Sequence, residues 1–436
     1  MRFLFLQKNG LPWHGSMAIS AMLKQQGHDV QLLLTDEEGR NLKQSIQQYW
    51  PHFVLMSVIT GEERWAQDMA SLAKSICRPC IVVGGPHPTF YAETVQYADY
   101  VIRGEADNLW ATLEQPPGEY LLQPVPDIVM LPMLDRSLYY DRYPHLAKAS
   151  SKQVLAARGC PYACSFCSNH LTHKLFPGTQ RVRRRMPSQV VLEIMDVAQH
   201  WGLKTVSFTD DVFCTDSEWL DKFLPLYRSA VGLPFICNTR FDVFNESLAE
   251  RLKWAGCYGV EMGVESGVQR IRAEILGKGN KPNETIIKAG QIAKKLKLAL
   301  KTYNIIGIPS ETFNDAMETV RLNQQVKADQ TSCSFMTPYP KYDIAKHYPA
   351  GTVTTSSIYQ PGKWVPREIV NLQTFFFILV KAPWLEGLVR KLCKLPPNPL
   401  FRTAALGVYG LFMAKVHRLT LGDIWRYVRH IKPERI

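Results

Sequence analysis

The stretch ARGCPYACSFCSNH (157–170) follows a predicted strand directly and contains three cysteines in a C-x3-C-x2-C pattern, Cys160, Cys164 and Cys167. Three thiolates on one short loop can hold an iron-sulfur cluster, and they leave one iron with an open coordination position for a substrate or cofactor. Zinc is a weaker alternative because a tetrahedral site needs a fourth ligand, which His170 or His173 could supply. A disulfide is weaker still in a reducing compartment. The pattern therefore indicates a reactive metal centre.

Strand and helix signals alternate around this motif, from residue 150 to residue 345. Six apolar strand segments are spaced as in strand-helix repeats: 152–157, 205–210, 235–240, 258–265, 300–307 and 332–339. Such a repeat predicts a partial (β/α)6 barrel of the TIM type.

Residues 1–125 show a similar alternation with shorter repeats. Five apolar runs read as buried parallel strands, at 2–7, 29–34, 53–59, 80–85 and 100–104. Helices are expected at 16–27 and 41–50. The pattern predicts a Rossmann-like, doubly wound α/β domain, which binds ligands at the carboxyl ends of its strands. A Pro-rich segment, placed at 126–149, reads as a linker to the barrel.

The C-terminal region, 346–436, changes character. It contains the apolar stretches 371–380 and 399–419, yet residues 362–436 carry 13 Lys and Arg against 4 Asp and Glu. We expect a mostly helical, basic and apolar region. Core and cap helices are the favoured interpretation, and a hydrophobic substrate site or contact with a membrane surface is the alternative.

Composition and charge narrow the class of protein. The 436 residues are 46% hydrophobic and 21% charged, which excludes a disordered or collagen-like chain. The formal net charge of +12 is uneven, because residues 1–135 carry 9 Lys and Arg against 15 Asp and Glu. The run RVRRR (181–185) is more often solvated or paired than substrate-binding. Absence of a signal-like N-terminus and of long apolar runs predicts a cytoplasmic protein, and no nucleic-acid motif is present.

The cysteine motif, with the aromatic Phe166 just before its third cysteine, resembles the signature of the radical SAM superfamily. The resemblance implies that Cys160, Cys164 and Cys167 ligate a 4Fe-4S cluster and that S-adenosylmethionine (SAM) chelates the fourth iron. Reductive cleavage of SAM would then give a 5′-deoxyadenosyl radical. By position, Phe166 would lie against the adenine, and an electron donor such as flavodoxin or ferredoxin is implied.

Further segments fit the same resemblance: TDDVF (209–213), GCYGVEMGVESG (256–267) and GIP (307–309). They imply a group of residues near bound SAM, namely Asp210, Asp211, Glu265, Ser266, Gly307 and Pro309. Two structural alternatives stay open. The two aspartates suit an ordinary helix cap, and Glu265 suits a buried carboxylate whose hydrogen bonds are satisfied.

The N-terminal domain together with the barrel resembles the cobalamin-binding radical SAM proteins. The segments VGGPHPTF (83–90) and RGEAD (103–107) carry this resemblance. It implies that four small residues at strand ends contact cobalamin: Ser57, Thr60, Gly84 and Gly85. The D-x-H-x-x-G motif that supplies a lower axial histidine is absent, and His14, in the loop that replaces it, is more often a solvated residue than a ligand.

These features lead to three functional hypotheses. The first is a cobalamin-dependent radical SAM methyltransferase that acts on an unactivated carbon of a small molecule, with a lipidic or polycyclic substrate favoured by the apolar C-terminal region. The second is a radical SAM oxidative cyclase or rearrangement enzyme without methyl transfer. The third is a membrane-associated binding protein with a structural cluster, suggested by the aromatic run 375–377 and the basic tail. No catalytic residue is assigned.

Overall fold

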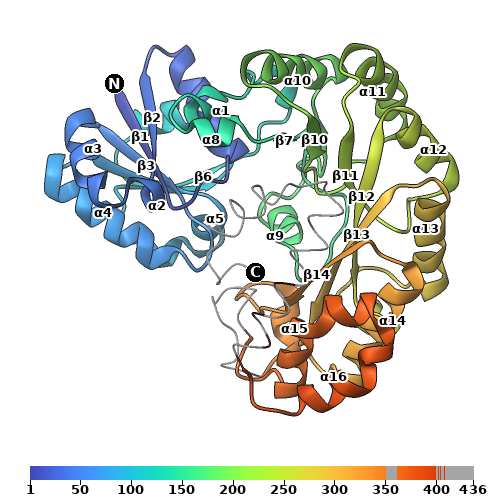
Figure 1. Cartoon of the computed structure of the whole chain (residues 1–436). Coiled ribbons are helices and arrows are strands. Elements are labelled where there is room, and N and C mark those ends of the chain that lie inside the picture. The colour runs from blue at the N-terminus through green and yellow to red at the C-terminus, as the bar shows by residue number, and fades with distance from the viewer. Residues whose placement is uncertain (350–360, 399–400, 402, 404–406, 408–436) are drawn as a thin grey trace. The chain divides into compact units, whose positions relative to one another are not determined.

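The computed structural model describes residues 1–349 and 361–398, together with residues 401, 403 and 407 (Figure 1). The chain divides into two compact units. One comprises residues 1–161 and 171–206, and the other comprises residues 162–170 and 207–436. The cysteine loop changes unit, since Cys160 belongs to the first and Cys164 and Cys167 belong to the second.

The first unit is built on a six-stranded parallel sheet with the order β2-β1-β3-β4-β5-β6. Its strands are β1 (Arg2–Gln7), β2 (Asp29–Leu34), β3 (Phe53–Ser57), β4 (Cys80–Gly84), β5 (Tyr100–Gly104) and β6 (Gly118–Leu122). The Rossmann-like fold is confirmed, with one strand beyond the five expected. β6 carries no continuous apolar run, because half-buried and exposed residues alternate along this edge strand.

Helices cover both faces of this sheet. They are α1 (His14–Gln25), α2 (Thr35–Glu38), α3 (Leu42–Tyr49), α4 (Glu63–Cys77), α5 (Pro86–Tyr91) and α6 (Leu109–Leu113). Phe3 and Phe5 pack in one core with residues of α1, whereas Leu4 and Leu6 pack in another with residues of α3 and α4. Side chains alternate between the faces of a strand, so one apolar strand serves two cores.

The segment 126–149, predicted as a linker, packs against this sheet. It contains the short helices α7 (Ser137–Tyr140) and α8 (Pro144–Ala147). Tyr139 and Tyr143 are buried in the same core as Phe3, and the Tyr143 hydroxyl accepts a hydrogen bond from the Leu34 backbone at 2.8 Å. The segment is therefore an integral layer of the first unit.

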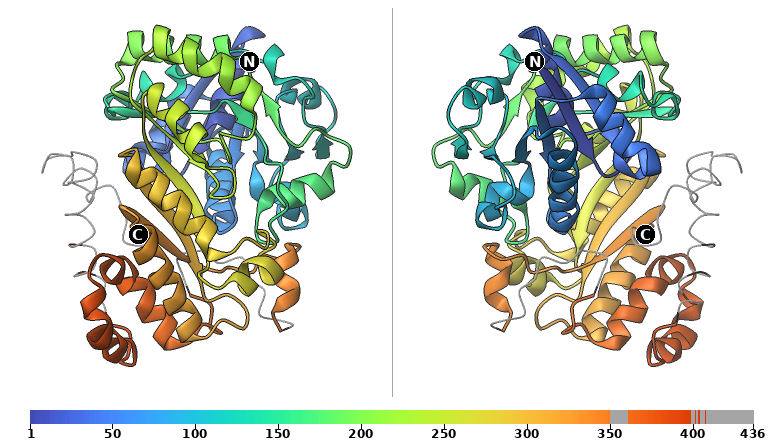
Figure 2. Two further views of the ribbon diagram at one scale, coloured as in Figure 1. Left: turned by 90° about the vertical axis from the view of Figure 1, so that its right-hand side faces the viewer. Right: turned by 90° about the vertical axis from the view of Figure 1, so that its left-hand side faces the viewer.

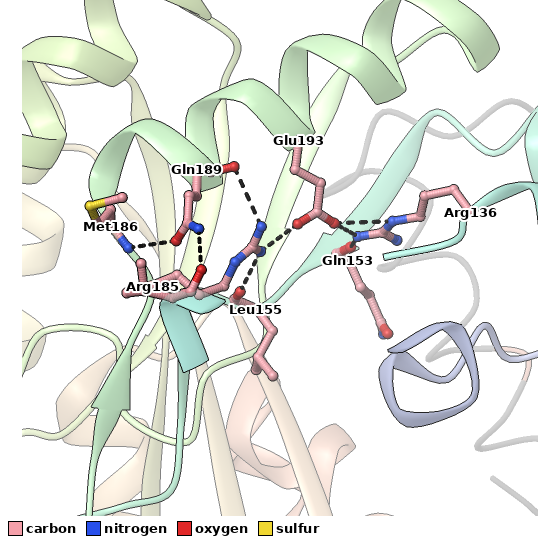
Figure 3. Close-up of polar contacts among 8 residues, drawn as sticks. Arg136, Gln153, Leu155, Arg185, Met186, Gln189 and Glu193 are labelled. Carbon is pink, nitrogen blue, oxygen red and sulfur yellow. Dashed lines mark hydrogen bonds and ion pairs between the residues drawn. The ribbon is translucent and has the colours of Figure 1, made fainter. Parts of the chain in front are cut away.

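A buried ion-pair network ties this segment to α10 (Pro187–Trp201) (Figure 3). The Glu193 carboxylate lies between Arg136 and Arg185 and accepts hydrogen bonds from both, at 3.1 Å from Arg136 Nε. Arg136 also donates to the Gln153 carbonyl at 2.8 Å, and Arg185 donates to the Leu155 carbonyl at 3.1 Å. Burial alone would raise the pKa of Glu193, but the two arginines lower it.

The second large sheet has six strands in the order β14-β13-β12-β11-β10-β7. The strands are β7 (Ser151–Val154), β10 (Thr205–Phe208), β11 (Phe235–Thr239), β12 (Cys257–Glu265), β13 (Ala299–Ile306) and β14 (Gln330–Phe335). Every predicted barrel strand is present, and β11 to β14 pair in parallel. The prediction of a partial TIM-type barrel is confirmed.

Helices α11 (Ser217–Ala230), α12 (Glu246–Trp254), α13 (Asn283–Lys295) and α14 (Phe313–Val326) follow the strands of this sheet in turn. Figures 1 and 2 show α11, α12 and α13 along its outer face. The strand ends therefore carry the loops in which the predicted site residues lie.

The described part of the C-terminal region is helical, as predicted, with α15 (Arg367–Lys381) and α16 (Glu386–Cys393). Phe375, Phe376 and Phe377 are buried, and the first two pack with apolar residues of α14 and α16. The aromatic run is therefore core and does not face a lipid. The second apolar stretch, 399–419, lies outside the described residues apart from 401, 403 and 407. Within the described residues, no helix combines the length and the apolar character needed to cross a membrane.

Candidate active site

The cysteine loop starts at a short antiparallel ribbon of β8 (Ala157–Arg158) and β9 (Arg183–Arg184). Gly159 follows β8 and has a φ of +92°, which L-residues with a side chain rarely adopt. A Cβ atom there would lie 2.1 Å from the Arg181 carbonyl oxygen. The turn that leads into Cys160 therefore requires glycine.

A cluster of ion pairs holds this ribbon within the first unit. Arg158, two residues before Cys160, donates to both carboxylate oxygens of Asp107 at 2.7 and 3.0 Å and to Glu105 at 2.9 Å. Arg183 donates to the same Glu105 at 2.9 Å. Despite its burial, Glu105 has a lowered pKa because of these two arginines. Both carboxylates come from the RGEAD segment after β5, so this segment positions the start of the cysteine loop.

The rest of the loop is anchored within the second unit, chiefly through Ser165. Its amide donates to the Leu276 carbonyl at 3.0 Å, and its hydroxyl donates to the Ile275 carbonyl at 2.6 Å. Its own carbonyl accepts from the Ile344 amide at 3.0 Å. The neighbouring Phe166 packs against the apolar cluster that includes Ile275, Leu276 and Ile344. Backbone and ring contacts thus fix the segment between the second and third cysteines.

Residues Ile271–Ile275 form a π-helical turn, an uncommon element that often occurs at functional sites. Arg272 within it is fully buried and donates to the Ser266 carbonyl at 2.6 Å. The next turn brings Gly277 against the loop, where a Cβ atom would lie 3.9 Å from Cys164 Cα. This segment therefore connects the end of β12 to the cysteine loop.

The three motif cysteines are half-buried, and none of the ten cysteines forms a disulfide. Burial is the main cause of a raised pKa at Cys167, whereas Asn169 lowers it by donating an amide hydrogen bond to Sγ at 3.7 Å. His170, the candidate fourth zinc ligand, contacts Asp343 at 2.7 Å through Nε2. Among the described residues, no three His, Cys, Asp or Glu side chains gather around a point that would suit a single metal ion. A cubane places its irons at separate corners, so its thiolates need not meet at one point.

The predicted aspartates follow β10. Asp210 is buried, and its carbonyl accepts from the Asn238 side chain on β11 at 2.9 Å, whereas Asp211 is exposed. Neither caps α11, because its N-cap is Asp216, which accepts from the Trp219 amide at 2.9 Å. The helix-cap alternative for the two aspartates is therefore wrong.

Glu265 ends β12 with a φ of +65°, next to a register shift between β12 and β13. Its carboxylate folds back to pair with Lys278 at 2.7 Å, and a Cβ atom at Gly263 would lie 2.2 Å from it. Glu265 is thus buried and paired, as the structural alternative anticipated. Ser266, which is fully buried, follows directly. A strained backbone of this kind is characteristic of ligand sites.

Gly307 and Pro309 follow β13. Gly307, with a φ of +72°, donates its amide to Glu311 at 2.6 Å, and the Ile308 amide donates to the same oxygen at 3.2 Å. Burial raises the pKa of Glu311 to about 8. Gly307 also accepts from the Tyr348 hydroxyl at 3.3 Å, while Pro309 is half-buried. Hydrogen bonds to Glu311 and from Tyr348 therefore hold the loop that follows β13.

In the first unit, Ser57, Thr60, Gly84 and Gly85 lie at the carboxyl ends of β3 and β4, as predicted. The Val58 amide donates to the Gly84 carbonyl at 2.8 Å. At Gly85, with a φ of +101°, a Cβ atom would lie 2.6 Å from Ser57 Oγ. The Thr60 hydroxyl lies 3.2 Å from Nδ1 of the buried His87. The backbone at Gly85 thus packs closely against the end of β3.

His14 begins α1 and is not a solvated loop residue. Burial, followed by the charge of Arg136, lowers its pKa to about 4, so the imidazole is neutral at physiological pH. Its Nε2 atom is buried and has no hydrogen-bond partner within the described residues.

Comparison with known proteins identifies two domains. Residues 8–114 match the model of the B12 binding domain, and residues 154–322 match the model of the radical SAM superfamily. The chain therefore contains a radical SAM domain and a B12-binding domain. The predicted combination of a B12-binding domain with a radical SAM barrel is confirmed, and the protein is an enzyme of this class. The matched ranges lie inside the predicted domains 1–125 and 150–345.

Individual relatives of this radical SAM protein are similar over most of its length. An uncharacterized methyltransferase of Pyrococcus horikoshii is 28% identical over 365 residues, 74% of this chain and 76% of that protein. The anaerobic magnesium-protoporphyrin IX monomethyl ester cyclase of Rubrivivax gelatinosus is 24% identical over 355 residues, 72% of this chain and 61% of the cyclase. This chain therefore spans less than two thirds of the cyclase.

A solved structure shares the fold. The radical S-adenosylmethionine methyltransferase TsrM from Kitasatospora setae, with cobalamin and a 4Fe-4S cluster bound, superposes with a TM-score of 0.63 at 17% identity. The match covers 79% of this chain and 76% of TsrM.

The sequence alone did not single out several residues that contact the predicted site of this radical SAM protein. Lys278 pairs with Glu265, Asn169 donates to Cys167, and Arg158 holds the start of the loop through Asp107. Asn169 and Arg158 lie within two residues of a motif cysteine, so their proximity was available as a signal. Lys278 had no such signal, because its partner is distant in sequence.

Proposed function

We propose that this radical SAM enzyme is a cobalamin-dependent methyltransferase that acts on an unactivated carbon of a small hydrophobic substrate. The observation that carries the proposal is the presence of a B12-binding domain and a three-cysteine radical SAM domain in one chain. The relative of P. horikoshii is named as a methyltransferase, and so is the structural neighbour TsrM. When bound, the cluster with SAM supplies a hydrogen-abstracting radical and cobalamin supplies a methyl carrier.

We assign Cys160, Cys164 and Cys167 as the cluster ligands. The donor set fits the group, because three thiols on one loop leave the fourth iron open for SAM. The Asn169 amide that donates to Cys167 Sγ favours the thiolate form that a ligand needs. The anchored Ser165 and Phe166 hold the loop so that little reorganisation accompanies loading.

We assign the SAM contacts to the ends of three strands of the barrel sheet. The residues are Asp210, Asp211, Glu265, Ser266, Gly307 and Pro309, and Phe166 of the cysteine loop joins them. The carboxyl ends of parallel strands share one edge of a sheet, so side chains following β10, β12 and β13 border a common ligand site. The buried Lys278 near Glu265 adds a cation that suits the SAM carboxylate.

We assign the cobalamin contacts to Ser57, Thr60, Gly84 and Gly85. The strand-end glycines allow a ligand to approach the backbone closely, and the hydroxyls supply hydrogen bonds. As functional ranges we propose 1–125 for cobalamin, 150–345 for the radical SAM barrel and 346–436 for the C-terminal region, with 126–149 packed on the first.

Anaerobic reconstitution tests the proposal. The full chain is loaded with iron and sulfide and incubated with SAM, cobalamin and a chemical reductant, and the products of SAM are measured by mass spectrometry. We expect 5′-deoxyadenosine together with retention of cobalamin, and S-adenosylhomocysteine once an acceptor is supplied. Cys164→Ala should lose SAM cleavage, while Cys77→Ala, a matched half-buried cysteine outside the motif, should keep it. SAM cleavage retained in Cys164→Ala contradicts the ligand assignment.

A cyclase or rearrangement enzyme is the second candidate, favoured by the similarity to the R. gelatinosus cyclase. Product analysis separates the two activities. A product heavier than its substrate by one methyl group, with S-adenosylhomocysteine formed, supports methyl transfer. A product that lacks hydrogen and forms no S-adenosylhomocysteine supports cyclisation.

Peripheral contact with a membrane is a further part of the proposal. Trp384, Leu388 and Leu395 are 80%, 54% and 46% exposed at and beside α16, and Lys391 and Lys394 lie in the same segment. Exposed aromatic and aliphatic side chains beside lysines suit an anionic lipid surface. Sedimentation with anionic liposomes should occur and weaken with salt; no sedimentation at low salt contradicts the contact. For the reductant we propose flavodoxin or ferredoxin, and for the compartment the cytoplasm, where thiols stay reduced.

A further inference from the structure

Tyr162 lies in the cysteine loop between the first and second motif cysteines, and a buried arginine stacks on it. The Arg240 Cζ atom is 3.8 Å from the centroid of the Tyr162 ring. Arg240 is 6% exposed and follows β11 directly, so it lies at the carboxyl end of this strand of the barrel sheet. Burial of the cation strengthens a cation–π contact of this kind.

The guanidinium is fixed in this position from two other sides. Its Nε and Nη2 atoms donate to the two carboxylate oxygens of Asp242, at 2.9 and 2.8 Å. Nη2 also donates to the Lys278 carbonyl at 3.0 Å. A planar group held by a bidentate pair and a third bond has few alternative orientations. The Tyr162 ring therefore packs against a rigid surface.

Arg240 also acts on Cys164 through its charge. Burial alone would lower the pKa of Arg240, but Asp242, followed by the charges of Cys164 and Tyr162, raises it. The guanidinium is therefore charged, and it lies against the ring of Tyr162, two residues before Cys164. Asp242 neutralises part of this charge, so its effect on Cys164 is smaller than that of an unpaired arginine.

We propose that Arg240 is a positioning residue of the cysteine loop, which holds Tyr162 against the end of β11 and places a fixed positive charge near Cys164. The proposal rests on the assignment of a 4Fe-4S cluster to Cys160, Cys164 and Cys167. Reduction adds one electron to the cluster, and a nearby fixed cation stabilises the more negative form. Arg240 therefore raises the reduction potential of the cluster and eases electron uptake before SAM cleavage.

The test compares the reduction potential of the cluster in full-length variants. Each variant is reconstituted anaerobically, its iron content is measured, and the reduced fraction is followed by electron paramagnetic resonance during a titration with titanium(III) citrate. Arg240→Met keeps part of the apolar stem and removes the charge, whereas Arg240→Lys keeps the charge and loses the planar stack. Arg228→Lys is the matched control, because Arg228 stacks on Trp254 at 4.4 Å and is exposed on α11.

We expect the reduced-to-oxidised ratio of the cluster at a fixed potential to fall about tenfold in Arg240→Met, which is 59 mV for a one-electron couple. In Arg240→Lys the ratio should fall about threefold, and Arg228→Lys should match the unaltered chain. If Arg240→Met fails to fold or to bind iron, the reduction potential of the cluster in Arg240→Lys tests the proposal. Unchanged potentials in an iron-loaded Arg240 variant overturn the inference. Failure of the unaltered chain to bind a cluster overturns the cluster assignment instead.

Discussion

Glu193 offers a sharp test of the packing that supports the site. Its carboxylate pairs with both Arg136 and Arg185, and the side chains of Glu193 and Arg136 are 2% and 1% exposed. Glu193→Gln leaves a buried guanidinium facing a neutral amide. Removing one partner of a buried pair costs about 3–5 kcal/mol. Arg185 is 15% exposed and also donates to backbone carbonyls. Water and these carbonyls compensate in part for the loss of its bond to Glu193, so the cost is counted once and not for each arginine.

Hydrogen exchange measured by mass spectrometry is the assay, because a chain with two units need not unfold in one step. Peptides from α10 report the opening of the first unit directly. A loss of about 3–5 kcal/mol corresponds to exchange roughly 150 to 5,000 times faster. The matched control is Glu246→Gln, which breaks the solvent-exposed pair with Lys295 and should leave exchange in α10 unchanged. Exchange in α10 within threefold of the unaltered chain refutes the reasoning.

The same pair predicts a pH dependence with a definite sign. The two arginines lower the pKa of Glu193 in the folded chain below its ordinary value of 4.5. Its stabilisation is therefore fully present above about 4.5, the unfolded value, and is lost as the pH falls through the lowered folded value. The difference in exchange between the unaltered chain and Glu193→Gln should stay constant from pH 6 to 8, within about threefold. A difference that grows with acidification would falsify the assignment of charge.

Three further predictions concern the loops of the site. Gly159→Ala forces a Cβ atom to within 2.1 Å of the Arg181 carbonyl, so iron bound after reconstitution should fall to half or less, and full occupancy contradicts the steric argument. Asp107→Asn weakens the bidentate pair with Arg158, whose bonds measure 2.7 and 3.0 Å, and should reduce the stability of the first unit by about 2–3 kcal/mol in urea unfolding; an unchanged midpoint would exclude this role. Glu311 has a pKa raised to about 8 in the folded chain, whereas in the unfolded chain it loses its proton near pH 4.5. The free energy of unfolding should therefore decline as the pH rises from about 4.5 to about 8. Glu311→Gln should remove that decline. A decline that persists in the variant shows that another titrating group causes it.

Much of the fold follows from the sequence because buried parallel strands are continuous apolar runs. The five predicted strands of the first sheet are of this kind, whereas barrel strands such as β7 and β14 carry many polar residues and are recognised by their place in the strand-helix repeat. The exception, β6, is an edge strand whose residues are only half-buried, so its hydrophobic signal is weak. The helices α7 and α8 are four residues each, which is too short for a helical period to show. Their role became visible only through the tyrosines that they bury.

The residues of the candidate site likewise fall into those that the sequence identifies and those that only the structure reveals. The cysteine motif and the strand-end glycines are local patterns, and a local pattern can be read without the fold. The partners that give those residues their properties are not local. Lys278 reaches Glu265 across a π-helical turn, and Arg240 reaches Tyr162 from a strand 78 positions along the chain. Which cation meets which group is decided by β-strand order and register, and single-sequence periodicity carries no information about either.

The arginine run near the cysteine loop shows most clearly that the sequence alone does not identify the partners of a charged side chain. The run RVRRR (181–185) is the densest group of basic residues after position 135, and the sequence favours a solvated or paired role for it without naming the partners. In the structure Arg183 bonds to Glu105, Arg185 bonds to Glu193, and Arg181 donates to the Pro161 carbonyl at 3.2 Å. Two of the carboxylates that take up this charge are Glu105, from the acidic first domain, and Glu193, from α10. A run of arginines thus serves to fix the ribbon that leads into Cys160.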